Sequence, residues 1–211
     1  MSDHSDVARL EEKIQRLRSL IDTSAILSSS LDLDEVLRLV LETAQKVVNG
    51  EASAILLYNP ATNKLEFEVA LGEKGGLIQS LRPKITLDLG QGIAGTVAQM
   101  RQAEWVPDAV RDPRVAKTVD NATGFVTKNI LCAPLLARDR LVGVAEVMNL
   151  AHPERCGPDD IEIFGAFCQQ VGVAIENTRL HQVLLERERE KQQLEFAAVV
   201  QQSFLPSSVP T

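Results

Sequence analysis

The chain has 211 residues and a net charge of −7, with 45% hydrophobic and only 4% aromatic residues. This content suffices for one packed core, while the acidic balance and scarce aromatics argue against nucleic acid or an anionic membrane surface as a partner. The sequence has no run of 18 apolar residues, no signal-peptide pattern and three scattered cysteines, which predicts a cytoplasmic protein that does not enter a membrane.

The N-terminal segment carries apolar residues at alternating steps of three and four, namely Val7, Leu10, Ile14, Leu17 and Ile21. This spacing is typical of a coiled-coil seam. A helix of this length is marginal alone in water, so it must bury its stripe on a twin chain or on its own domain. We assign residues 1–30 to an N-terminal amphipathic helix and expect it to pair with a second copy.

The middle of the chain alternates between short strands and turns. A helix should begin at Asp32, which forms a capping box with Glu35, and should end at Asn49-Gly50. A second, short helix is expected from about Gly92 to Gln102, and an irregular loop over residues 107–128. The expected strands cover residues 52–58, 65–71, 85–87, 104–106, 130–137 and 141–150.

The last part of the chain is predicted to be one long helix. Gly157-Pro-Asp-Asp160 is typical of a helix start, and the apolar stripe continues without a break from Ile161 to Leu184 and beyond. A helix from about residue 158 to residue 203 exceeds the needs of one small domain and indicates a signalling stalk. We therefore expect a parallel homodimer through the Val7–Ile21 and Ile161–Leu184 helices.

Together these elements predict an α+β domain with a mostly antiparallel sheet of about 5–6 strands, flanked by helices, with long coiled-coil helices at both ends. Several segments, taken in this order, resemble the GAF family of sensory domains: residues 90–98, 106–109, 112–114, 124–135 and 141–150. The resemblance implies a GAF domain over residues 31–180, which binds a small molecule and has no catalytic machinery.

The C-terminal segment Phe196–Pro210 resembles the lead-in to bacterial metal-dependent serine/threonine phosphatase domains of the sporulation and stress-response type. This resemblance implies that residues 181–211 are a signalling helix and linker to a phosphatase effector domain. We expect the chain to be part of a longer bacterial sensor phosphatase, whose acidic metal ligands would lie beyond residue 211.

A ligand pocket is expected between the sheet and the loop from Pro107 to Asn129, capped by the short helix. The candidate lining residues are Ile93, Val97, Trp105, Asp108, Val115, Phe125, Lys128 and Asn129. The first alternative is a dimerisation scaffold with an empty pocket. The second is a dinucleotide-binding oxidoreductase, because Gly90-x-Gly92-x-x-Gly95 matches a phosphate-cradling pattern. A tight turn that lets a helix pack close to the sheet explains the same glycines.

Other polar residues give weaker indications. Asn149 with Asp160 partly matches the motif of cyclic-nucleotide-binding family members, but Leu150 and Cys156 depart from it, and Asp160 is equally explained as a helix start. His152 and Cys156 are only half of a tetrahedral set, so we expect neither metal nor haem, and the cofactor stays open. Cys156, in a polar loop near a helix start, is a candidate redox sensor.

Overall fold

The computed structural model describes residues 32–73, 75–76, 85–115 and 124–204, with side chains as far as residue 196. The predicted helix Val7–Ile21 and residues 205–211 lie outside this part of the chain. No helix within the described residues combines the length and apolar character that a membrane crossing requires.

The described chain forms a six-stranded sheet in the order β3-β2-β1-β6-β5-β4, in which each strand pairs antiparallel with its neighbours. This confirms the predicted α+β fold and excludes the parallel unit of a dinucleotide-binding domain within these residues. The strands are β1 (Gly50–Asn59), β2 (Lys64–Leu71), β3 (Thr86–Asp88), β4 (Glu104–Val106), β5 (Ile130–Ala137) and β6 (Arg140–Leu150).

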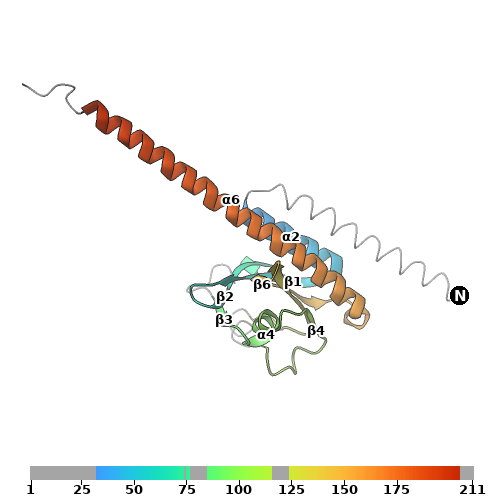
Figure 1. Cartoon of the computed structure of the whole chain (residues 1–211). Helices are drawn as coiled ribbons and strands as arrows, with labels where there is room; N and C mark the ends of the chain where they lie inside the picture. The colour runs from blue at the N-terminus through green and yellow to red at the C-terminus, as the bar shows by residue number, and fades with distance from the viewer. Residues whose placement is uncertain (1–31, 74, 77–84, 116–123, 205–211) are drawn as a thin grey trace, which may run out of the picture.

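The sheet lies between two layers (Figure 1). Helices α2 (Leu33–Val48) and α6 (Pro158–Phe204) cover one face, which we call the helix face, and the short helix α4 (Gly92–Met100) lies against the other, which we call the α4 face. Each face has its own apolar cluster, because alternate residues of a strand point to opposite sides. A single-turn 3-10 helix, η1 (Pro153–Arg155), connects β6 to α6.

Local interactions set the ends of α2 as predicted. The Asp32 carboxylate accepts the backbone N–H of Asp34 at 2.9 Å and that of Glu35 at 3.4 Å, which satisfies two amides that have no partner within the helix. Asn49 closes the helix in the left-handed conformation, with φ of 51°. Between these caps, the buried residues all fall on the side that meets the sheet: Val36, Leu37, Val40, Leu41 and Ala44.

The glycines before α4 serve close packing. Gly90 and Gly92 have φ of 84° and 71°, which disfavour any other residue. A Cβ on Gly95 would collide with the backbone carbonyl of Asp88, so the helix can approach β3 only with glycine there. This geometry supports the tight-turn interpretation of the glycine pattern.

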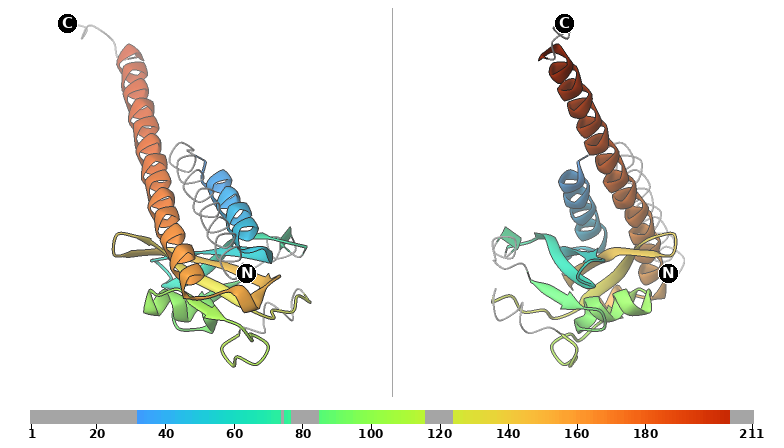
Figure 2. Two further views of the ribbon diagram at one scale, coloured as in Figure 1. Left: turned by 90° about the vertical axis from the view of Figure 1, so that its right-hand side faces the viewer. Right: turned by 60° about the vertical axis from the view of Figure 1, so that its left-hand side comes forward.

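Helix α6 has 47 residues and runs well past the sheet (Figure 2). The observed bounds agree with the predicted helix from about 158 to 203. Its apolar stripe divides in two, which corrects the expected dimer surface. Phe164, Phe167, Cys168, Val171 and Ile175 are buried against the domain's own sheet, so they cannot face a second copy in this arrangement. The exposed apolar residues of α6 include Val173, which lies between the buried Val171 and Ile175 in the sequence, and Leu180 further along.

Candidate functional site

The α4 face is an apolar surface crossed by one polar row. Its buried cluster contains small and medium side chains from all six strands and from α4, among them Ala54, Leu56, Leu65, Ile93, Val97, Cys132 and Val144. The strand register places Glu104 opposite Cys132, Cys132 opposite Glu146, and Glu146 opposite Ala54. Two carboxylates and a thiol therefore follow one another across an otherwise apolar face.

Glu146 lies at the centre of this row and is only 7% exposed. The Cys132 thiol donates to its Oε1 over 3.8 Å. Burial raises the pKa of the Glu146 carboxyl to about 7, and the hydrogen bond from the thiol opposes this only in part. The carboxyl therefore exchanges its proton near neutral pH, which is far from the usual behaviour of a glutamate.

Burial also raises the pKa of the Cys132 thiol well above its ordinary value, and the negative charge of Glu146 adds to the effect. Cys132 therefore stays protonated and acts as a hydrogen-bond donor to Glu146, not as a nucleophile. Cys168 is buried on the opposite face, and burial raises its pKa as well.

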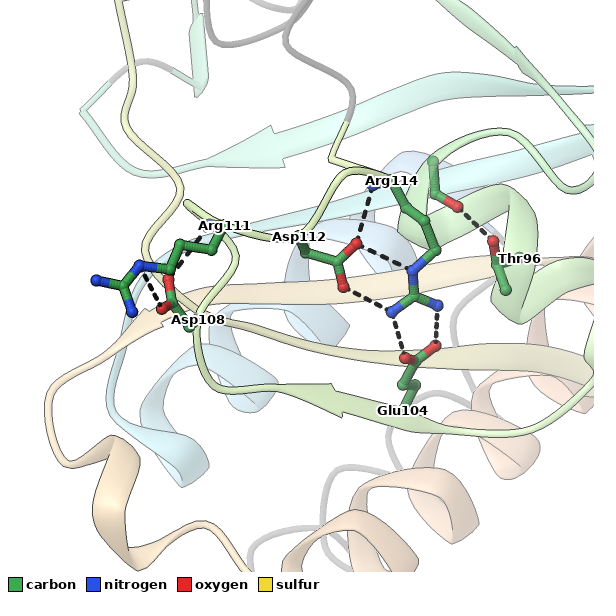
Figure 3. Close-up of polar contacts among 7 residues, drawn as sticks. Thr96, Glu104, Asp108, Arg111, Asp112 and Arg114 are labelled. Carbon is green, nitrogen blue, oxygen red and sulfur yellow. Dashed lines mark hydrogen bonds and ion pairs between the residues drawn. The ribbon is translucent and has the colours of Figure 1, made fainter.

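At the other end of the row, Arg114 joins the long loop to β4 (Figure 3). Its guanidinium donates two hydrogen bonds to the Glu104 carboxylate, at 3.1 and 2.6 Å, and two to that of Asp112, at 3.1 and 2.8 Å. The bonds from Arg114 lower the pKa of Asp112, and both carboxylates raise the pKa of Arg114. One cation between two anions holds the loop against the sheet edge and leaves this group with a net negative charge.

Asn149 fixes the segment that leads into β5. Its Oδ1 accepts the backbone N–H of Lys128 at 2.7 Å, and its Nδ2 donates to the Val126 carbonyl at 3.0 Å and to Glu51 at 2.9 Å. Asp160 accepts the backbone N–H of Gly157 at 3.0 Å, which is the helix-start role considered from the sequence. Asn149 holds the segment before β5 and Asp160 bonds the start of α6. These hydrogen bonds explain the two residues of the partial cyclic-nucleotide motif without a bound nucleotide.

The structure places the predicted lining residues on both sides of the sheet. Ile93 and Val97 of α4 are buried in the α4-face cluster, and Val115 packs against it. Trp105 packs instead on the helix face, because β4 alternates and its neighbour Val106 faces α4. The structure therefore does not bring Trp105 together with the other three.

The remaining predicted residues belong to the loop. Asp108 is exposed and forms a 3.5 Å ion pair with Arg111. Phe125 is half-buried, and Lys128 is exposed while its carbonyl accepts the N–H of Ala109. Asn129 is buried, and its side chain accepts the backbone N–H of Leu150 at 2.8 Å, which gives it a structural task.

The His152 and Cys156 pair borders a separate hollow of about 40 Å³ at the start of α6, together with Arg155 and Asp160. No group of three or more potential metal ligands occurs in the described part of the chain.

Sequence reasoning missed the polar row itself. Glu146 is the only charged residue in the apolar stretch Leu141–Leu150, and this was the signal that could have drawn attention to it. The position of Cys132 and Glu104 in the same row as Glu146 could not be predicted from the sequence, because it depends on the register of three strands.

Comparison with known proteins agrees with this architecture. The GAF domain family model matches residues 30–176. The GAF domain of a phosphoenolpyruvate-protein phosphotransferase (ptsP) from Coxiella burnetii superposes with a TM-score of 0.69 at 15% identity, covering 81% of this chain and 98% of that one. At this identity, the likeness shows the fold alone.

Similar sequences occur within much longer proteins. The probable 3',5'-cyclic phosphodiesterase pde-5 of Caenorhabditis elegans is 29% identical over 197 residues, which cover 89% of this chain and 27% of that protein. The cGMP-specific 3',5'-cyclic phosphodiesterase of Drosophila ananassae is 25% identical over 174 residues, which cover 78% of this chain and 15% of that enzyme. This chain thus spans about a quarter or less of their length.

Proposed function

Because this chain belongs to the GAF domain family, whose members are regulatory ligand-binding modules, we propose that it senses a small molecule on the α4 face. Helix α6 then passes the signal to an effector domain. Of the predicted lining residues, Ile93, Val97 and Val115 contribute the apolar part of the site. Asp108, Phe125, Lys128 and Asn129 belong to its rim, and Trp105 is not part of it.

One observation carries this proposal: β5 and β6 contribute side chains to both layers. Cys132 and Glu146 face the ligand side, while the residues next to them in sequence, including Ala133 and Ala145, pack on the helix face. The backbone of α6 touches β5 directly, since a Cβ on Gly172 would collide with the backbone of Leu136. A ligand that shifts these strands must therefore move α6 or strain the contact.

Ligand binding is tested by thermal unfolding in the presence of cyclic GMP, cyclic AMP, nicotinamide and flavin dinucleotides and common metabolites. Cyclic GMP is included because a similar phosphodiesterase is named for it. A ligand at 100 times its Kd should stabilise the protein by about 2.7 kcal/mol. Amide chemical shifts should change at Ile93 and Val97 and less at Val171 on the helix face. A uniformly flat panel would instead favour the ligand-free dimerisation scaffold.

The exposed stripe of α6 supports a parallel homodimer. Val173, Leu180 and Leu184 are 41, 54 and 58% exposed and step by seven and four residues, as in a heptad seam. Asn177, seven residues before Leu184, occupies the same heptad position, where asparagine fixes the register of two-stranded coiled coils. The charged segment Glu186–Lys191 interrupts this seam. We propose that the exposed residues within 173–184 form the dimer contact that the sequence predicted for the whole stripe Ile161–Leu184.

Two variants separate this seam from the rest of the helix. Leu184→Asp places a charge in the seam and should convert a dimer into a monomer in analytical ultracentrifugation. Leu185→Asp changes the adjacent residue, which is 38% exposed and outside the seam, and should leave the dimer intact. A wild-type monomer, or a dimer that survives Leu184→Asp, would contradict the proposal.

The effector domain that we propose is a metal-dependent serine/threonine phosphatase, on the basis of the resemblance of residues 196–210 to the lead-in of such domains. The GAF domain would then bias a packing equilibrium of the paired helices, and a ligand can shift it only by its difference in affinity between the two states. The coding sequence that follows codon 211 in the gene tests the identity of the effector domain. Acidic metal ligands in a phosphatase core are expected, whereas a phosphodiesterase domain would refute the assignment.

A further inference from the structure

Within the described part of the chain, Glu146 has fewer hydrogen-bond partners than a buried carboxylate needs. Among the described residues, its one hydrogen-bond partner is the Cys132 thiol, a weak donor that reaches Oε1. No fully enclosed side-chain oxygen or nitrogen in the described part of the chain lacks a hydrogen bond. The second oxygen, Oε2, has no hydrogen bond to a described residue, and Glu146 keeps 7% of its surface exposed.

Among the described residues, none of those around Glu146 is a cation that could neutralise it. Ala54 and Cys132 flank it on the neighbouring strands, and α4 (GIAGTVAQM) has no titratable residue. Glu104 lies two strands away, at roughly 10 Å by the usual strand spacing. Arg114 is the nearest described cation of the row, and its guanidinium already binds Glu104 and Asp112. The charged groups described along the row are therefore negative in sum.

We propose that Glu146 binds the protonated amino group of a small-molecule ligand on the α4 face. This inference rests on the proposed function, because it assigns a ligand class to the same site. An ammonium group supplies the strong donors and the positive charge that the thiol cannot supply. An anionic group placed here would meet Glu146 without any described cation to offset it, and a hydroxyl would supply one neutral hydrogen bond.

Protonation of Glu146 couples amine binding to pH. Only the ionised carboxylate forms the ion pair, so with a pKa of about 7 the fraction competent to bind rises steeply between pH 6 and pH 8. Amine affinity should therefore be about tenfold higher at pH 8 than at pH 6. Among the described residues, the titratable groups along this row are the Cys132 thiol beside Glu146 and, further along, Glu104 with its partner Arg114 and Asp112. Cys132 stays protonated across this range.

Benzylamine and benzyl alcohol test the proposal, because they share a shape and differ in charge. Affinities are measured by titration calorimetry and by amide chemical shifts at pH 6 and pH 8. The proteins are the wild type, Glu146→Gln and the control Glu162→Gln, which alters an exposed carboxylate on α6. We expect benzylamine to bind the wild type and Glu162→Gln at least tenfold more tightly than the alcohol at pH 8, and this preference to vanish in Glu146→Gln.

Equal affinities of amine and alcohol for the wild type would overturn the inference, as would an amine preference that survives Glu146→Gln. If a neutral or anionic compound shifts the resonances of Ile93 and Val97 while the amine has no advantage, the ligand class is wrong and the proposed function stands. If neither these probes nor the metabolite panel shifts the α4 face, both fail. The pH series on the wild type provides an answer even if the variant folds poorly.

Discussion

Replacing Glu146 by glutamine should stabilise the protein in alkaline solution and change little in acid. The folded protein holds the pKa of this carboxyl at about 7, above its ordinary value of 4.5, because burial disfavours the charged form. Below pH 4.5 the carboxyl is protonated in both the folded and the unfolded state, so its ionisation has no effect on stability. As the pH rises from 4.5 to 7, the carboxyl ionises first in the unfolded state, which is thereby stabilised relative to the folded state, and the free energy of unfolding falls.

The size of the effect follows from the two pKa values. The folded and unfolded pKa values differ by about 2.5, and a difference of one in pKa corresponds to about 1.4 kcal/mol. The wild type should therefore lose about 3 kcal/mol between pH 4.5 and pH 8 through this residue, whereas the neutral amide of the variant loses nothing. For a domain of this size, such a difference in the free energy of unfolding shifts Tm by roughly 10 °C.

Urea unfolding at pH 5 and pH 8 measures this difference, and the comparison with the variant cancels the titration of all other groups. Glu162→Gln is the matched control, because Glu162 is exposed on α6 and the same substitution there should have equal effects at both pH values. If Glu146→Gln and the wild type differ by the same free energy at pH 5 and pH 8, the carboxyl ionises normally in the folded protein. The assignment of a buried, protonatable anchor would then be wrong.

Three further outcomes are expected. Arg114→Met should destabilise the fold by about 1 kcal/mol in urea unfolding, because a partly exposed ion pair contributes only modestly to stability. The same variant should increase amide hydrogen exchange in residues 109–115, because the ion pairs of Arg114 hold this loop in place. Unchanged exchange would contradict this prediction. Gly143→Ala should cost about 1–3 kcal/mol in thermal unfolding, since its Cβ would collide with the carbonyl of Leu56, and a neutral result would show that β1 and β6 can separate. Peptide mass spectrometry should find that Cys156 reacts first with iodoacetamide at pH 7.5, because the other two cysteines are buried, and labelling of a buried cysteine first would refute this.

The helices and strands of this fold could be predicted from the sequence, because their signals are local. The alternation of apolar and polar residues in 65–71, the cap at Asp32 and the uninterrupted helical pattern after Pro158 depend on residues a few positions apart. The observed bounds differ from the predicted ones by at most about two residues. The glycines around Gly92 predicted a tight turn for the same reason, although they left the dinucleotide alternative open until the strand directions were known.

The contacts between residues far apart in the chain depend on how the sheet and helices pack. Trp105 was expected to line the pocket, but the pairing of β4 with β5 turns it to the helix face. A helix that packs on its own domain and a helix that pairs with a second copy have the same apolar stripe in the sequence from Ile161 onward. In the structure, the sheet beneath α6 buries Ile175 within its own domain. Glu146 acquired its raised pKa from burial beside Cys132, which is fourteen residues away in the chain. Local patterns restrict the register of a hairpin, but burial and the pairing of strands far apart in the chain are properties of the packed sheet.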